Sequence, residues 1–142
     1  MAKWPFLSAR VRREVARRAD YLCEYCRLQQ DLCPEPFEIE HIIPRALNGP
    51  TELGNLCFAC PVCNNSKQDR VAAWDEVTGQ RVRLFHPRLQ VCERHFRWSE
   101  DFGTVLGRTP VGRATVTALE MNHPRVVQIR LLCAGLGLHP PE

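Results

Sequence analysis

The sequence predicts a small single domain of the α+β class, residues 1–142. Apolar residues at helical spacing begin the chain, short alternating segments follow, and two further helical patterns end it. A chain of 142 residues can bury one modest hydrophobic core. Two Cys-x-x-Cys pairs, Cys23 with Cys26 and Cys60 with Cys63, indicate that a metal site supplements that core.

The first expected element is a helix near the N-terminus. Ser8 is a suitable N-cap, and the helix should run to about Ala19. Its apolar stripe consists of Leu7, Val11, Val15 and Leu22. Another face carries Arg10, Arg13 and Arg17 at i, i+3 and i+7. That face is either simply solvated or contacts the phosphates of a nucleic acid.

The middle of the chain reads as strand, loop, strand and helix. Residues 37–41 alternate as a strand, which Pro44 ends, and Asn48-Gly49-Pro50 indicates a turn. Residues 56–59 are apolar and short enough to be the returning strand. A helix should begin at Pro61 or Asn64 and run to about Trp74, with Val71 and Trp74 on its apolar side.

The last part of the chain predicts a β-hairpin and two helices. Residues 82–84 and 95–98 alternate as strands, and Asp101-Phe-Gly103 should turn the second into residues 104–106. Thr109-Pro110 can open a helix that ends near Met121. The final helix follows Asn122-His123-Pro124 and ends at Gly135 and Gly137. Its expected stripe is Val126, Ile129, Cys133 and Leu136.

Charge and composition favour a soluble, cytoplasmic protein. The N-terminus has no apolar signal-peptide core, and Arg130 interrupts the most apolar late segment, so no membrane span is expected. The formal net charge is +3, and a zinc ion on four thiolates would lower it to roughly +1. Residues 1–20 nevertheless hold six cations, Lys3 among them, against two acids. A basic patch at the N-terminus is therefore predicted.

The two cysteine pairs predict one structural zinc site. Each pair can bend around one ion, and 33 residues separate Cys26 from Cys60. Cys57 with Cys60 also has knuckle spacing, but using Cys57 would leave Cys63 unpaired directly before the helix. Disulfides or redox chemistry are the alternatives. The other cysteines are expected to be buried or free thiols, namely Cys33, Cys57, Cys92 and Cys133.

A longer motif surrounds the second knuckle. It runs Glu40-His41-Ile-Ile-Pro44, Gly49, Asn55-Leu56 and Cys60-x-x-Cys63-Asn64-x-x-Lys67. This motif resembles the HNH endonucleases, and within them the Cys₄ branch, in which two knuckles hold zinc beside a ββα-metal site. Asn64 occupies the position of the final histidine in the family's name, so the pattern is an HNN variant. The tail is similar to that of small stand-alone bacterial HNH proteins.

The resemblance implies a role for each motif residue. His41 would be the general base that activates water, and Glu40 and Asn64 would hold a catalytic divalent ion. Asn55 would fix the loop of His41 by hydrogen bonds to the backbone. Oxygen ligands suit Mg²⁺ or Mn²⁺ better than zinc. Glu38 and Asn65 are alternative ligands, and Glu40 can share a site with His41 only if the strand curls.

The predicted function is metal-dependent hydrolysis of DNA phosphodiester bonds. Residues 23–74 would form the ββα-metal core and residues 75–142 an extension packed on it. Lys67 and Arg70, one turn apart, would contact phosphates, or else form a solvated helix face. Double-strand cutting would need a homodimer or two visits. The alternatives are a catalytically silent, zinc-stabilised DNA-binding module and a zinc-ribbon adaptor for proteins.

The remaining histidines and aromatic residues are expected to be structural. His86, His95, His123 and His139 have no partner at metal-ligand spacing. Phe96 and Trp98 alternate with arginines, which is compatible with stacking on nucleic-acid bases. Packing in the core or in the hairpin is the preferred interpretation for both rings.

Overall fold

The computed structural model describes residues 7–141, so Lys3 lies outside the described residues. Three separate two-stranded antiparallel sheets and five α-helices make up the described chain. In chain order the elements are α1 (Ala9–Arg18), β1 (Glu38–His41), β2 (Leu56–Ala59), α2 (Pro61–Lys67), β3 (Ala72–Asp75), β4 (Gln80–Arg83), α3 (Cys92–His95), β5 (Phe96–Trp98), β6 (Val105–Gly107), α4 (Pro110–Ala118) and α5 (Pro124–Gly135). This is the predicted α+β class.

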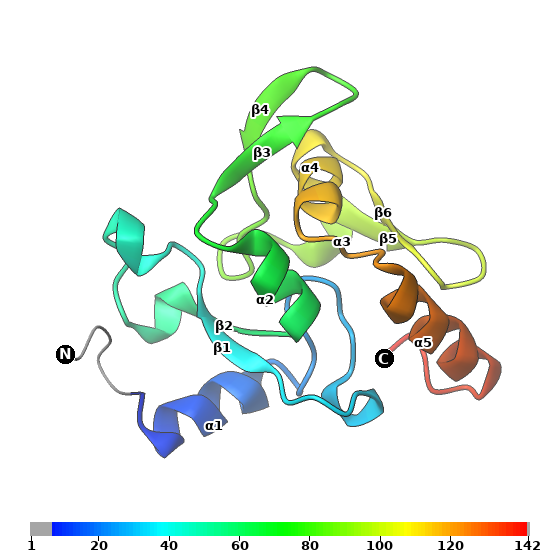
Figure 1. Ribbon diagram of the computed structural model, residues 1–142, viewed down its shortest axis with the longest axis horizontal. Coiled ribbons are helices and arrows are strands. Elements are labelled where there is room, and N and C mark those ends of the chain that lie inside the picture. Colours follow the sequence, from blue (N-terminus) through cyan, green and yellow to red (C-terminus); the bar gives the residue numbers. More distant parts are fainter. Residues whose placement is uncertain (1–6, 142) are drawn as a thin grey trace.

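The N-terminal half is built on the β1–β2 hairpin, against which α1 and α2 pack (Figure 1). Ser8 caps α1 as expected, since its hydroxyl accepts a hydrogen bond from the amide of Val11 at 3.2 Å. Val15 is fully buried, and Leu7 and Val11 pack against the same core. Every residue of β2 is buried. The hairpin therefore forms the centre of the N-terminal half, with α1 and α2 packed against it.

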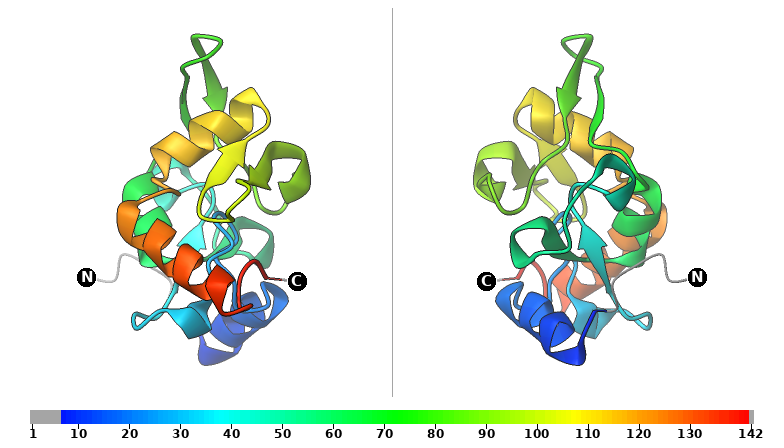
Figure 2. Two further views of the ribbon diagram at one scale, coloured as in Figure 1. Left: turned by 90° about the vertical axis from the view of Figure 1, so that its right-hand side faces the viewer. Right: turned by 90° about the vertical axis from the view of Figure 1, so that its left-hand side faces the viewer.

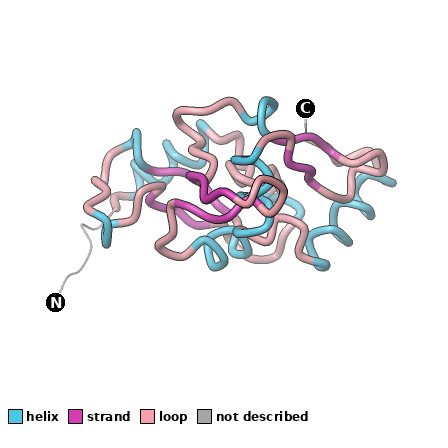
Figure 3. The backbone as a smooth tube through the Cα atoms, turned by 90° about the horizontal axis from the view of Figure 1, so that it is seen from above, coloured by secondary structure: helices cyan, strands magenta, loops and turns pink. Residues whose placement is uncertain are grey.

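The C-terminal half packs around α4, which contacts β3, β4 and β6. Thr109 caps α4 by accepting from the amide of Gly112 at 3.0 Å, as the sequence predicts. The strands β5 and β6 pair across the predicted turn. Seen from above, the strands are short and loops make up much of the backbone (Figure 3).

The prediction that the motif helix extends to Trp74 was wrong. The helix α2 ends at Lys67, because Gln68 adopts a positive φ of 54° that an α-helix cannot contain. Residues 72–75 form β3 instead and pair with β4. Trp74 is 63% exposed rather than packed on an apolar helix face. The chain thus contains an additional hairpin directly after the motif.

The final helix forms as expected, but its apolar stripe is shorter than predicted. Val126 is buried and Ile129 packs against the core, whereas Leu136 is 73% exposed. Arg130 is buried instead and donates hydrogen bonds to the carbonyls of Gly103 and Met121. Within the described part of the chain, no helix is long and apolar enough to cross a membrane.

Candidate active site and zinc centre

Four buried cysteines form a cluster with the dimensions of a zinc site. The sulfur atoms of Cys23, Cys26, Cys60 and Cys63 all lie within 4.8 Å of one another. The Cys26 and Cys60 sulfurs are 3.8 Å apart. A tetrahedral ion with Zn–S bonds of about 2.3 Å separates its sulfurs by roughly 3.8 Å. The predicted Cys₄ group is confirmed, and its geometry is that of a structural zinc site.

The cluster fixes where α2 begins. Cys60 is the N-cap of α2, and its sulfur accepts a hydrogen bond from the amide of Cys63 at 3.4 Å. Cys23 and Cys26 come from the turn that follows α1, more than thirty residues earlier. An ion shared by the four sulfurs would tie that turn to the first turn of α2, which carries Asn64 directly after Cys63.

The four cysteines outside the cluster are free thiols, as predicted. Cys57 does not join the knuckle, because it pairs with Glu40 across the β1–β2 hairpin. Its thiol donates to Glu40 Oε2 at 3.2 Å. Burial away from water raises the pKa of the Cys57 thiol well above its usual value. Cys57 therefore remains a protonated donor.

His41 lies at the end of β1, where the strand gives way to the loop before Pro44. The residue is buried, and its Nε2 lies 2.9 Å from the hydroxyl of Thr51. The pKa of His41 is lowered, first by burial and then by the positive charges of Arg45 and Lys67. The neutral imidazole is therefore favoured near pH 7. No sequence pattern indicated Thr51, because a lone loop threonine belongs to no recognised motif.

Asn55 is buried beneath the loop that follows His41. Its side-chain oxygen accepts from the amide of Ile43 at 2.9 Å. Its amide nitrogen donates to the carbonyls of Ile43 and Pro50 at 3.0 and 2.8 Å. Gly49 is required in the same loop, since a Cβ there would stand 1.7 Å from the Ile43 carbonyl oxygen. These are the contacts that a loop-fixing asparagine must make.

Glu40 is buried on the side of β1 that faces the core. Its Oε2 accepts a hydrogen bond from the hydroxyl of Tyr25 at 2.8 Å, in addition to the one from Cys57. Its Oε1 lies 2.8 Å from Lys67 Nζ. Burial raises the pKa of Glu40, and the neighbouring Lys67 charge opposes that shift. The carboxylate is thus held by three partners from three different segments.

Both oxygens of the Glu40 carboxylate have neighbours. Lys67 Nζ lies 2.8 Å from Oε1, and the same amine donates to the carbonyl of Ile42 at 2.9 Å. Glu40 nevertheless lines a cavity that His41 and Asn64 also line. A metal ion at Glu40 would therefore share this carboxylate with Lys67.

The prediction that Lys67 contacts DNA phosphates does not fit its position. Lys67 is 1% exposed, and its amine is held by Glu40 and Ile42. The helical spacing placed Lys67 and Arg70 on one exposed face, but α2 ends between them. Arg70 donates to the carbonyls of Ser66 and Ala118 at 2.6 and 2.8 Å. It therefore joins the end of α2 to α4.

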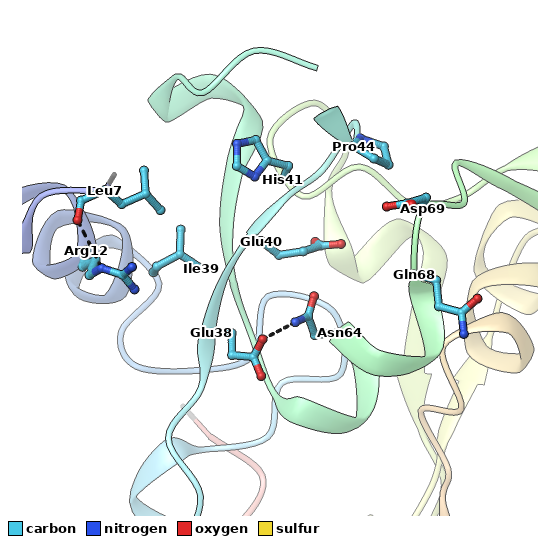
Figure 4. Close-up of a pocket in the computed structure, with 10 residues that line it drawn as sticks. All are labelled: Leu7, Arg12, Glu38, Ile39, Glu40, His41, Pro44, Asn64, Gln68 and Asp69. Carbon is cyan, nitrogen blue, oxygen red and sulfur yellow. Dashed lines mark hydrogen bonds between the residues drawn. The ribbon is translucent and has the colours of Figure 1, made fainter. Parts of the chain in front are cut away.

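Asn64 and Glu38 meet above the strand. Asn64 lies in the first turn of α2, and its amide nitrogen donates to Glu38 Oε2 (Figure 4). Glu38 lies on the same face of β1 as Glu40 and is exposed to solvent. The amide oxygen of Asn64 and an oxygen of Glu38 are therefore additional candidate metal ligands close to the Glu40 side of the strand.

A cavity of about 450 Å³ joins these groups. Its lining includes Glu38, Glu40, His41 and Asn64, together with Asp69 from the loop after α2. In Figure 4 the Glu40 carboxylate and the His41 ring extend from β1 in opposite directions, Glu40 toward α2. Both residues nevertheless line this cavity, and β1 ends at His41.

Arg12 also lines this cavity and was not singled out from the sequence. It comes from α1, and its Nε donates to the carbonyl of Leu7 at 3.3 Å. At 100° per residue, Arg12 lies about 60° from the buried Val15, on the edge of the helix nearest the hairpin. Helical spacing is the signal that could have placed Arg12 on this edge of α1.

The other predicted arginines of α1 lie away from the core. Arg10, Arg13 and Arg17 are all exposed. Arg17 forms an ion pair with Glu14 at 2.7 Å, with both side chains substantially solvated. The structure leaves both a solvated face and a phosphate-binding face open for these three residues.

The remaining histidines have structural contacts. His123 caps α5, and His86 accepts a hydrogen bond from the amide of Arg88. His95 lies 2.6 Å from the Thr109 hydroxyl, and His139 lies 2.9 Å from the Phe102 carbonyl. Phe96 and Trp98 pack within the protein, which is the interpretation preferred from the sequence. The ring of Phe96 contacts that of Phe85, and the ring of Trp98 contacts that of His139.

Comparison with known proteins agrees with the motif and the cluster. The family model described as HNH endonuclease matches residues 23–70. No curated protein and no solved structure matched the chain. The match covers about a third of the chain and includes all four clustered cysteines. Residues 23–70 therefore form an HNH endonuclease domain with the four-cysteine cluster typical of its zinc-bound members.

Proposed function

We propose that this protein is a metal-dependent endonuclease that hydrolyses DNA phosphodiester bonds, with His41 as general base. One observation carries the proposal. Within the HNH domain, a histidine with a lowered pKa lines the same cavity as the oxygen donors of Glu38, Glu40 and Asn64. Phosphodiester hydrolysis needs an activated water and stabilisation of negative charge, and these residue types supply both.

His41 would act through the nitrogen that does not face Thr51. In the tautomer with its proton on Nε2, that nitrogen donates to the Thr51 hydroxyl. The lone pair then resides on Nδ1, which can accept a proton from water. Because the pKa of His41 is lowered, the neutral form needed for this step predominates near pH 7. Thr51 would keep the ring in one tautomer and orientation.

Glu40 and Asn64 would hold the catalytic divalent ion. Their carboxylate and amide oxygens suit Mg²⁺ or Mn²⁺, and both residues line the same cavity. Glu38 can add a third oxygen through its contact with Asn64. When bound, such an ion neutralises charge on the phosphate and on the leaving oxygen.

Two further groups would position the reacting residues. Asn55 fixes the backbone at Ile43 and Pro50, so the loop after His41 is held from below. The Cys₄ zinc site fixes the start of α2 and hence the place of Asn64. Neither group would touch the substrate.

A catalytically silent DNA-binding module is the second candidate, and one observation favours it. Glu40 already has Lys67, Tyr25 and Cys57 as partners, so its buried charge is compensated without a catalytic ion. Incubating purified protein with supercoiled plasmid, with and without added Mg²⁺ or Mn²⁺, separates the two. Metal-dependent nicking supports the nuclease. DNA binding without nicking under any metal condition would support the silent module instead.

A further inference from the structure

The hairpin β3–β4 is the feature that the HNH domain does not account for. It begins two residues after the matched region ends at residue 70. In both side views its turn projects beyond α4 at one end of the molecule (Figure 2). Its two strands pair in the register Ala72↔Arg83, Ala73↔Val82, Trp74↔Arg81 and Asp75↔Gln80.

The register divides the hairpin into two faces. Residues directly opposite each other in an antiparallel pair share a face, and successive residues alternate. One face carries Ala73 and Asp75, which are packed or buried on the α4 side. The other face carries Trp74 opposite Arg81, followed by Arg83. Trp74 is 63% exposed, and both arginines are exposed.

The buried face holds the hairpin rigid. Arg113 of α4 donates to both carboxylate oxygens of Asp75, at 2.9 and 3.0 Å. The same carboxylate accepts from the hydroxyl and amide of Thr78, which closes the turn. Because Asp75 is neutralised by Arg113, Glu76 is the acid of the hairpin left to oppose the two arginines. The exposed face therefore presents an aromatic ring beside two positive charges on a backbone that α4 holds in place.

A nucleic acid is the partner whose chemistry matches this face. Arginines form bidentate hydrogen bonds with phosphates, and an exposed tryptophan can stack on sugars or bases. Two-stranded ribbons are also narrow enough to enter a groove of duplex DNA. Because tryptophan and arginine are also common in protein interfaces, the positive charge of the face is what favours a polyanion as the partner.

The position of the hairpin along the chain links it to the candidate active site. Asp69 lines the cavity of His41, and Trp74 follows five residues later. Five residues span at most about 18 Å. Duplex DNA rises 3.4 Å per base pair, so this distance corresponds to about five base pairs. The hairpin therefore lies within a few base pairs' length of the cavity.

We propose that β3–β4 is a second DNA-binding element. It binds the duplex beside the scissile phosphate through Arg81, Arg83 and Trp74. This inference rests on the proposed nuclease function. The hairpin extends the contact from one phosphate in the cavity to several base pairs. It thereby orients the duplex for cleavage.

Binding of a labelled 20-base-pair duplex tests the proposal. Fluorescence anisotropy is measured without added divalent cation at several salt concentrations. Arg81→Ala/Arg83→Ala should bind at least about tenfold more weakly than wild type, and its log–log salt slope should be shallower by about 2. Trp74→Ala should weaken binding several-fold without changing the slope, because it removes no charge.

Matched variants control for loss of exposed side chains elsewhere. Arg94→Ala/Arg125→Ala removes two exposed arginines, and Leu132→Ala removes a side chain that is 71% exposed. Both should retain wild-type affinity and melting temperature. Wild-type affinity and slope in both hairpin variants would overturn the proposal, as would tighter binding of an RNA duplex than of DNA.

Plasmid nicking by the wild type distinguishes this inference from the proposed function. If the wild type nicks plasmid while the hairpin variants bind and nick equally well, only the inference about the hairpin fails. If the wild type neither binds nor nicks DNA with Mg²⁺ or Mn²⁺, the proposed function fails and the hairpin proposal fails with it.

Discussion

The carboxylate of Glu40 depends on a buried amine, and this dependence governs what substitutions there can do. Lys67 is 1% exposed and Glu40 is 7% exposed, so neither charge is well solvated. Removing one member of a buried ion pair leaves the other charge uncompensated. The pair therefore contributes to stability as well as to the position of the proposed metal ligand.

Lys67→Met should destabilise the protein by about 3–5 kcal/mol. Glu40 would lose its only cationic partner among the described contacts and would be driven toward the protonated form. Urea denaturation measures the free energy of unfolding. The exposed neighbour Gln68→Ala is the matched control and should change it by less than about 0.5 kcal/mol. A Lys67→Met variant as stable as Gln68→Ala would show that the ion pair is not needed for folding.

The pH dependence of cleavage follows from the state of His41. Burial and two nearby cations lower its pKa from the usual 6.5, so the neutral base persists to lower pH. The cleavage rate should rise with pH through a midpoint below 6.5 and level off before pH 7. Initial nicking rates across pH 5–8, at saturating metal, give this profile. A midpoint above 7 would contradict the assignment of His41 as the base.

Among the elements, α1 carries two kinds of arginine with different expected roles. Arg12 lines the cavity, whereas Arg13 lies on the outer face. Arg12→Ala should lower the nicking rate at least about tenfold, because a cation near the scissile phosphate is removed. Arg13→Ala, the adjacent matched control, should lower it less than twofold. If Arg12→Ala lowers the nicking rate no more than Arg13→Ala does, Arg12 has no specific role at the cavity.

The zinc cluster holds the first turn of α2 to the turn after α1. Cys63→Ser should lose the ion and lower the melting temperature strongly or cause aggregation, because a three-thiolate site binds zinc much more weakly. Elemental analysis and thermal melting measure both effects. Cys33→Ser changes a half-buried thiol outside the cluster and should keep one zinc per chain. A zinc-free protein with normal melting would contradict a structural role.

The extent to which elements could be predicted depends on whether their signals were local. The caps Ser8 and Thr109 and the returning strand at residues 56–59 use local signals, and all three were predicted. The strand β3 was missed because its residues also fit a helix pattern. In the structure α2 ends at Lys67, and β3 is held by a contact between Asp75 and Arg113, which lies 38 residues away. No local pattern contains that contact.

The same distinction applies to the site. The cysteine spacing and the Glu-His pair predicted the cluster and the cavity residues, because those residues form a motif. Thr51 and Arg12 belong to no motif, and their roles appear only once the loop and α1 are placed beside β1. The burial of Lys67 could not be predicted from the sequence pattern either, because it depends on where α2 ends.

At the scale of the whole molecule, the two halves are joined near the end of α2. Ser66 donates to Glu120 at 2.7 Å, and Arg70 donates to the carbonyl of Ala118. Glu24 and Arg88 form a further ion pair between the halves. These contacts join the half of the molecule that contains the Cys₄ cluster and the candidate active site to the half that contains the projecting hairpin.

The central claim is that His41 is the base and Glu40 a metal ligand, and one measurement separates these roles. Plasmid nicking is followed for wild type, His41→Ala and Glu40→Ala across a titration of Mg²⁺ or Mn²⁺, with melting temperatures as folding controls. His41→Ala should fold and bind DNA but cleave at least about 100-fold more slowly at every metal concentration. Glu40→Ala should be partly rescued by excess metal, because it loses affinity for the ion. A His41→Ala protein that cleaves at the wild-type rate would contradict the account.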